Sequence, residues 1–253
     1  MTRCRGLWSG SGPTDMSRVA IVAALEREVH PLVKSWQVGE KEYEGRKFRF
    51  FENGDAVLVC GGIGAEAARR ASEAVIAVFE PAVVYSVGFA GALDSSFKVG
   101  DIVRPKSVVN ARDGSSVGLD GGDGVVVTSP SVASPKQKTK LRESYGAQAV
   151  DMEAAAVARA AELRGVTFGV IKAISDEVDF EFPSTEQFID SSGNFSERRF
   201  ALFAVMRPWL WGRVIDLARN SGRAARALCA ALEVLLASKN LMGHVPASET
   251  APP

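Results

Sequence analysis

Residues 82–91 read AVVYSVGFAG, in which a run of small, apolar and β-branched residues at 82–87 is closed by Gly88-Phe89-Ala90-Gly91. Such a run is typical of a strand buried on both faces of a parallel sheet. A helical pattern over residues 65–79 precedes it, and Pro81 ends that helix. Similar apolar runs occupy residues 18–24 (RVAIVAA) and 166–174 (VTFGVIKAI). Strands that alternate with helices in this way predict an α/β fold with a mostly parallel sheet.

Weaker patterns fill the rest of the chain. A hairpin around Asn53-Gly54 is expected from residues 47–51 and 56–60. Further strands are predicted at 101–110, 124–128 and 148–150, and helices at 25–36, 136–144 and 153–163. The C-terminal part holds helical stretches within 197–215, broken at Pro208, and a second amphipathic helix at 221–236. Neither reaches the roughly 20 uninterrupted apolar residues that span a bilayer, so no transmembrane helix is expected.

The domain organisation follows from where this periodicity starts and stops. Residues 1–16 are rich in Gly and Ser and predict a disordered leader, with Met16 as the natural start. Residues 17–242 are expected to form a single domain whose C-terminal part, from about 195 to 240, is helical. Residues 243–253 lack periodicity and are interpreted as a tail.

Composition narrows the class of function. The 253 residues include 30 Lys plus Arg and 30 Asp plus Glu, a zero net charge that argues against a nucleic-acid partner held by bulk electrostatics. The 2 histidines and 3 cysteines lack metal-ligand spacing, so neither a metal, a cofactor nor a disulfide scaffold is indicated. So few cysteines suit a reducing cytoplasm. With histidine nearly absent, carboxylates are the expected acid–base groups of any enzyme.

Carboxylates and glycines gather where the predicted strands end, the edge at which open α/β sheets bind ligands. Each has a structural alternative: glycines serve tight turns, Glu153 could only cap a helix, and Asp176 could only open a loop. Their joint placement at one sheet edge favours a site. In chain order the segments are Glu26 to Glu28, Gly61-Gly62-Ile63-Gly64, Gly88-Phe89-Ala90-Gly91, Asp151-Met152-Glu153 and Ser175-Asp176.

These segments, together with Val99-Gly100-Asp101-Ile102-Val103, resemble the purine nucleoside phosphorylase and uridine phosphorylase superfamily over about residues 18–190. The resemblance is strongest to the nucleosidases that cleave methylthioadenosine, adenosylhomocysteine and futalosine. It implies a three-layer α/β/α phosphorylase-like fold with a mixed, mostly parallel central sheet. Residues 195–199 and 207–211 resemble the hopanoid-associated member, which implies adenosylhopane as a candidate substrate.

The resemblance also implies roles for individual residues. Asp176 would protonate N7 of the purine, Glu28 would activate water, and Glu153 would accept hydrogen bonds from the ribose hydroxyls. The Asp176 acid would either hold its proton at neutral pH or share one with N7 only in the transition state. Met152 would pack on the sugar. The other expected substrate-binding residues are Ser175, Phe89, Ala90, Gly91, Gly62, Ile63 and Gly64.

Two departures from the nucleosidase pattern bear on the reaction. Phe89 stands where those enzymes carry Ser, which makes that wall more apolar. The phosphate-binding arginines of the phosphorylases have no clear counterpart, because only Arg27 lies near a site motif. Hydrolysis that releases adenine from a nucleoside with an apolar 5′ substituent is therefore preferred. The alternatives are a phosphate-dependent phosphorylase and a catalytically inactive nucleoside-binding protein.

The resemblance implies a homo-oligomer, and the C-terminal part offers two interpretations. Aromatic residues alternate with arginines between residues 195 and 215. This pattern favours a core or subunit-interface helix. The second interpretation is peripheral contact with anionic lipid by an otherwise cytoplasmic protein.

Overall fold

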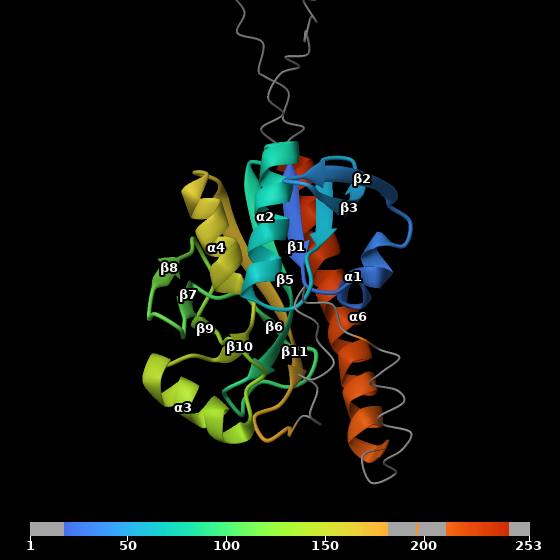
Figure 1. The fold of residues 1–253 in the computed structure, drawn as a ribbon. Coiled ribbons are helices and arrows are strands. Elements are labelled where there is room, and N and C mark those ends of the chain that lie inside the picture. Colours follow the sequence, from blue (N-terminus) through green and yellow to red (C-terminus); the bar gives the residue numbers. More distant parts are fainter. Residues whose placement is uncertain (1–17, 182–195, 197–210, 243–253) are drawn as a thin grey trace, which may run out of the picture.

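The computed structural model describes residues 18–181, residue 196 and residues 211–242. A mixed sheet of 11 strands runs through this part of the chain, with helices on both faces (Figure 1). The strands follow the order β2-β3-β4-β1-β5-β10-β9-β7-β8, and β11 pairs with β5 and β6. The arrangement confirms the predicted three-layer α/β/α fold with a mixed central sheet.

The secondary structure elements have the following bounds. The strands are β1 (Val19–Ala23), β2 (Gln37–Tyr43), β3 (Arg46–Asn53), β4 (Ala56–Cys60), β5 (Val83–Ala92), β6 (Ile102–Val103), β7 (Ser107–Asn110), β8 (Ser116–Gly118), β9 (Val125–Thr128), β10 (Ala149–Asp151) and β11 (Thr167–Asp176). The helices are α1 (Glu26–Val33), α2 (Ala65–Phe79), α3 (Pro135–Tyr145), α4 (Ala154–Leu163) and α6 (Trp211–Met242).

The central strand β5 changes its partner along one edge. Its first half pairs in parallel with β1, up to the register pair Val22 and Ser86. Its last residues pair with β10 in the antiparallel sense, with Gly91 opposite Val150. Strand β11 runs parallel along the other edge for nearly the whole length of β5. The carboxyl ends of β1 and β10 therefore approach each other from opposite directions along the stretch of β5 between these two pairings.

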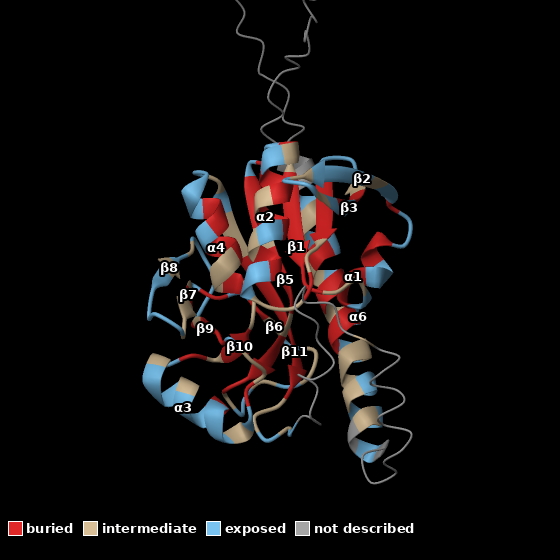
Figure 2. Ribbon diagram, viewed as in Figure 1, coloured by how far each residue is buried: buried red, intermediate tan, exposed pale blue. Residues whose placement is uncertain are grey.

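Helices cover both faces of the sheet because its central strands are apolar on both sides. Alternate residues of a strand point to opposite faces, and β1 shows this directly. Val19 and Ile21 pack in a core with α1 and α6, whereas Ala20 and Val22 pack in a second core with α2. Figure 2 shows the central strands fully buried, while α3 and the first turns of α6 are largely exposed. The two cores hold the sheet rigidly behind the edge where β1 and β10 end.

The structure confirms most of the elements predicted from the sequence and corrects three. Strand β5 does not stop at Gly88 but continues to Ala92, because Gly88 adopts φ 136° and keeps the chain extended. Strand β2 was not predicted, since its alternation is polar and its residues are largely exposed. The C-terminal helix does not begin at residue 221: α6 is continuous from Trp211 to Met242, since no proline interrupts it.

Several predictions fall on residues outside the described part of the chain. These are the leader at 1–16, the tail at 243–253, the motif at 195–199 apart from residue 196, and the break at Pro208. Among the described helices, none is both long enough and apolar enough to cross a membrane.

We predict that Phe50→Ala lowers the free energy of unfolding by about 3–5 kcal/mol, as is usual when a buried aromatic ring is removed. Phe50 is 0% exposed and packs edge-on against Phe79, with the ring centroids 4.9 Å apart. Val38→Ala on β2, where Val38 is 53% exposed, is the control and should change the stability by less than about 0.5 kcal/mol. Chemical denaturation measures both. Equal effects of the two substitutions would contradict this description of the core.

Candidate active site

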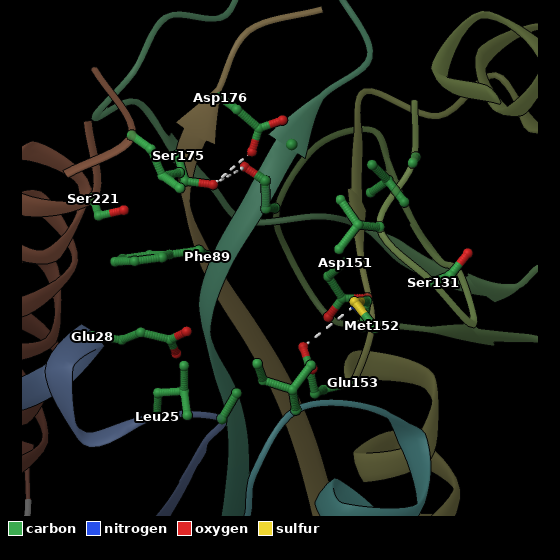
Figure 3. A pocket seen from close by; sticks show the side chains of 18 of the residues that line it. Leu25, Glu28, Phe89, Ser131, Asp151, Met152, Glu153, Ser175, Asp176 and Ser221 are labelled. Atoms are coloured by element: carbon green, nitrogen blue, oxygen red, sulfur yellow. Dashed lines mark hydrogen bonds between the residues drawn. The ribbon is translucent and has the colours of Figure 1, made fainter. Parts of the chain in front are cut away.

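A cavity of about 490 Å³ opens where the ends of β1, β10 and β11 meet β5. Figure 3 shows Asp176 and Ser175 at one end of the cavity and Glu28 and Glu153 at the other. The remaining lining residues come mainly from the α1 entry, the loop before α3 and the first turns of α6. The complete lining is Ala24, Leu25, Arg27, Glu28, Ile63, Phe89, Ala90, Gly91, Ser131, Val132, Ala133, Lys138, Val150, Asp151, Met152, Glu153, Ser175, Asp176, Val214, Leu217, Ala218 and Ser221.

Glu28 is a buried carboxylate in the first turn of α1, directly after β1. Burial, followed by the negative charge of Glu153, raises the pKa of Glu28 to about 7. Its Oε2 atom is buried and has no hydrogen-bond partner among the described residues. A Cβ at Gly88 would lie 2.8 Å from this oxygen, so the side chain of Glu28 occupies the space that a glycine leaves on β5. A group of this kind is poised to take up a proton near neutral pH.

Glu153 lies at the start of α4 and is held by backbone N–H groups. Its carboxylate accepts hydrogen bonds from Gly64 N at 2.8 Å and from Met152 N at 3.3 Å. Burial raises the pKa of Glu153 above its ordinary value, even though the positive charge of Lys172 opposes this shift. Gly64 adopts φ 96°, a backbone conformation that favours glycine, so the loop before α2 is shaped to donate to this carboxylate.

A buried ion pair that the sequence analysis missed lies beneath these two carboxylates. Lys172 Nζ on β11 lies 2.8 Å from Asp151 Oδ2, and both side chains are 0% exposed. Asp151 also accepts hydrogen bonds from Thr128 Oγ1 at 2.6 Å and from Ala154 N at 2.8 Å. Burial alone would lower the pKa of Lys172, but Asp151 and Glu153 together raise it. A lysine inside the apolar run 166–174 was the signal that could have revealed this pair.

Asp176 ends β11 and forms the polar group at the other end of the cavity. Its Oδ1 atom accepts a hydrogen bond from Ser175 Oγ at 2.7 Å. Its Oδ2 atom pairs with Nζ of Lys138, which comes from α3 and also donates to the carbonyl oxygen of Glu177 at 2.6 Å. Lys138 was not predicted, and the polar sequence of α3 carries no signal for a buried lysine.

Apolar side chains form one wall between the two polar ends. Phe89 and Leu25 lie on the side of the cavity with Glu28, and Ser221 of α6 lies close to Phe89 (Figure 3). The half-buried residues Val214 and Leu217 of α6 continue this wall. The departure at Phe89 therefore contributes an aromatic surface to the cavity, next to a helix from the C-terminal part.

Of the remaining predicted site residues, some line the cavity and two glycines do not. Ala90, Gly91, Ile63 and Met152 line the cavity. The others, Gly62 and Gly64, do not line it and act through the backbone. Arg27, the arginine that lies near a site motif in the sequence, lines the cavity. The described residues contain no group of three or more His, Cys, Asp and Glu side chains that could hold a metal ion.

Comparison with known proteins identifies the family. Residues 18–134 and 115–205 match the sequence profile of the phosphorylase superfamily, and the chain therefore belongs to the phosphorylase superfamily. Within it, the chain is similar to the nucleosidase-like branch. The 5′-methylthioadenosine/S-adenosylhomocysteine nucleosidase of Staphylococcus aureus (strain JH9) is 27% identical over 212 residues, which cover 69% of this chain and 93% of that protein.

Solved structures of the same fold include two bacterial enzymes. Futalosine hydrolase of Helicobacter pylori strain 26695 superposes with a TM-score of 0.62 at 19% identity, covering 87% of this chain and 98% of that chain. The 5′-methylthioadenosine/S-adenosylhomocysteine nucleosidase of Neisseria meningitidis, in complex with methylthio-immucillin-A, has a TM-score of 0.66 at 20% identity, covering 88% and 99%. At these identities the likeness concerns the fold.

We predict that Glu28→Gln stabilises the chain at alkaline pH and not at acidic pH. The raised pKa of Glu28 means that its protonated form favours folding. This contribution is fully present below about 4.5 and is lost as the pH rises through about 7. The melting temperature of the variant, relative to the unmodified chain, should therefore increase as the pH passes through this window.

Glu66→Gln is the control, because the side chain of Glu66 is 57% exposed and its hydrogen bond from Arg69 lowers its pKa. Its effect on the melting temperature should show no comparable pH dependence near 7. An effect of Glu28→Gln that is the same at both ends of the pH range would contradict the burial of an ionisable carboxylate at this position.

Proposed function

We propose that this enzyme hydrolyses the N-glycosidic bond of an adenine nucleoside with an apolar 5′ substituent and releases adenine. The observation that carries the proposal is the placement of Glu28 and Asp176 at opposite ends of one cavity. Departure of a purine requires a proton on the base and a nucleophile at C1′ of the ribose. A carboxylate at each end provides one group for each requirement.

The proposed roles follow from the polarity of the cavity. Glu28, whose pKa is about 7, takes a proton from water as the water oxygen bonds to C1′. The bond from C1′ to N9 breaks, and N7 of the base gains a proton at the Asp176 end. Glu153 accepts hydrogen bonds from the ribose hydroxyls, and Met152 packs against the sugar. The relatives support hydrolysis of a nucleoside as the reaction, because the Staphylococcus aureus and Helicobacter pylori proteins are a nucleosidase and a futalosine hydrolase.

The apolar wall suggests where the 5′ substituent lies. Phe89, Leu25, Val214 and Leu217 are uncharged side chains that line the cavity, and the first two lie on the Glu28 side. Apolar groups gain free energy by leaving water for such a surface, at roughly 25 cal/mol per Å² buried. We propose an apolar 5′ group here, with adenosylhopane as the candidate implied by the resemblance of the C-terminal part.

Phosphate remains a second candidate nucleophile, and Arg27 is the observation that favours it. Arg27 lines the cavity next to Glu28 and could supply a charge-assisted donor to an oxyanion. A phosphorylase would form a sugar 1-phosphate instead of a free sugar. The product therefore distinguishes the two reactions.

Assays of adenine release test the proposal. The purified chain is incubated with methylthioadenosine, adenosylhomocysteine, futalosine and a 5′-alkylthioadenosine, with and without phosphate. We expect adenine and a free sugar without any need for phosphate, and the highest kcat/KM for the apolar 5′ group. Release that depends entirely on phosphate would establish the phosphorylase. Tight binding of adenosine without turnover would establish an inactive binding protein.

We further predict that Asp176→Asn lowers kcat for base release by about 10²- to 10⁴-fold, the usual contribution of a positioned acid. The asparagine keeps an oxygen that can accept from Lys138, so the fold should survive, and circular dichroism checks this. Asp113→Asn is the control, because Asp113 is fully exposed. An Asp176→Asn variant with full activity would remove Asp176 from the mechanism.

We also propose that the chain forms a homo-oligomer, and sedimentation velocity measures its oligomeric state.

We further propose that residues 195–215, most of which lie outside the described part of the chain, contact anionic lipid. Flotation with liposomes measures this contact. We expect binding only to vesicles that contain anionic lipid. A chain that stays unbound with every lipid composition would exclude the membrane contact.

A further inference from the structure

Lys138 is the one buried residue of α3, a helix whose other residues are mostly polar and exposed or half-buried. Its side chain is 1% exposed. A lysine is almost never fully buried without a partner, because removing its charge from water is costly. The capping box of Ser134 and Gln137, with Pro135 at the first position, fixes the turn from which Lys138 points inward. The sequence of α3 therefore directs an ammonium group into the cavity wall.

The contacts of Lys138 lie at the base-binding end of the proposed site. Its Nζ atom pairs with Asp176 Oδ2, whose side chain is 4% exposed, and donates to the carbonyl oxygen of Glu177 at 2.6 Å. A Cβ at Gly91 would lie 2.7 Å from Asp176 Oδ2 and 3.3 Å from Lys138 Nζ, so the pair fills the space that this glycine leaves open. Both residues of the pair line the cavity.

This pairing bears on where the transferred proton resides before the reaction. A carboxylate in direct contact with a buried ammonium group is stabilised in its charged form. A charged carboxylate has no proton to give to N7 of a departing base. The proton that lies nearest to that carboxylate is on Lys138 Nζ. An ammonium group can give up a proton, whereas a guanidinium group in a protein does not.

We propose that Lys138 is the proton reservoir of the base-binding end, with Asp176 ionised in the empty site. This inference rests on the proposed function and deepens it. As the bond from C1′ to N9 breaks and negative charge grows on the base, N7 takes a proton through Asp176, and Asp176 takes one from Lys138. The step leaves a neutral amine, an ionised carboxylate and a neutral purine. Glu28 holds the proton lost by water, and exchange with solvent restores the starting state.

The other charged groups near the pair have partners of their own. Glu177 pairs with Lys98 at 3.0 Å, Arg142 pairs with Asp94 at 2.8 Å, and the Asp151 carboxylate pairs with Lys172. The first two pairs lie on partly exposed side chains, where their charges are screened by water. Lys138 is thus the cation in direct contact with Asp176 among the described residues.

Lys138→Arg tests the proposal because it keeps the charge and removes the transferable proton. We expect it to fold normally and to lower kcat for adenine release by about 10²- to 10⁴-fold, the usual contribution of proton transfer. In Lys138→Met, the buried Asp176 carboxyl must carry the proton itself, so activity should be lost at alkaline pH, where the unmodified chain stays active, while the need for an ionised Glu28 still sets the acidic limit of both profiles. Lys140→Arg, at an exposed position of the same helix, is the control and should match the unmodified chain.

A merely structural role for Lys138 predicts the reverse pattern. A residue that only fixes Asp176 by charge would be replaced by arginine with activity retained. The methionine variant would then lose activity equally at all pH values, and its melting temperature would fall. Full adenine release by a folded Lys138→Arg variant would therefore overturn the proposal.

A binding measurement tests the charge state without turnover. The probe is 9-deazaadenine, which carries a proton on N7 and pairs best with an ionised Asp176. Calorimetry in buffers with different heats of ionisation counts the protons released on binding. We expect none from the unmodified chain or Lys138→Arg, and about one from Lys138→Met, whose buried Asp176 must first ionise. Proton release by the unmodified chain would overturn the proposal.

The two readouts separate this inference from the proposed hydrolysis. An unmodified chain that binds 9-deazaadenine with the expected proton count, yet releases no base from any nucleoside, would refute the hydrolysis. In that case the ionised Asp176 would be supported as a group that recognises the base, and the proposed proton transfer from Lys138 would be refuted. A chain that hydrolyses nucleosides but retains full activity as Lys138→Arg would support the proposed function and refute the reservoir. Failure to bind any purine would refute both.

Discussion

The stretch of β5 between its pairings with β1 and β10 is the constraint from which the site is built. Strand β1 runs parallel to β5 and β10 runs antiparallel to it, so their carboxyl ends face each other along one edge. Each end is followed by a helix: Glu28 lies in the first turn of α1, and Glu153 is the N-cap residue of α4. Two carboxylates that are 125 residues apart in sequence therefore meet because of the direction of two strands. Gly88 leaves the space on β5 that Glu28 fills.

The buried charges around this edge fall into two kinds. Asp151 and Lys172 form a fully buried ion pair, and Asp151 is further held by Thr128 and the backbone of α4. Removing one partner of such a pair would leave an uncompensated charge, which typically costs about 3–5 kcal/mol. Glu28 differs, because its Oε2 atom lacks a hydrogen-bond partner in the described structure. A buried carboxylate oxygen without a hydrogen-bond donor is the pattern expected where stability is sacrificed for chemistry.

The sequence predicted the parts that local patterns determine. Apolar runs and helical periodicity located β1, β5 and β11 and the helices between them, because burial on both faces leaves an unmistakable composition. Placing carboxylates at strand ends brought Glu28, Glu153 and Asp176 to one cavity, as expected. Strand β2 was missed because a polar strand at the sheet edge has no apolar alternation to detect. Lys138 was missed because a lysine that a distant carboxylate buries looks, within a polar helix, like any other lysine. Lys172 carried a signal, its place inside the apolar run 166–174, and that signal was overlooked.

The long helix α6 packs in the core with its second half and lines the cavity with its early turns. Leu228 and Leu232, in its second half, are 0% exposed and belong to the same core as β1 and α1. Val214 and Leu217, about three to four turns before Leu228, line the wall of the cavity. Substitutions in the early turns can therefore reshape the pocket while the anchoring half continues to secure the domain. Such a division allows substrate preference to diverge among descendants of one ancestor without endangering the scaffold, and it makes these turns a natural place to redesign selectivity.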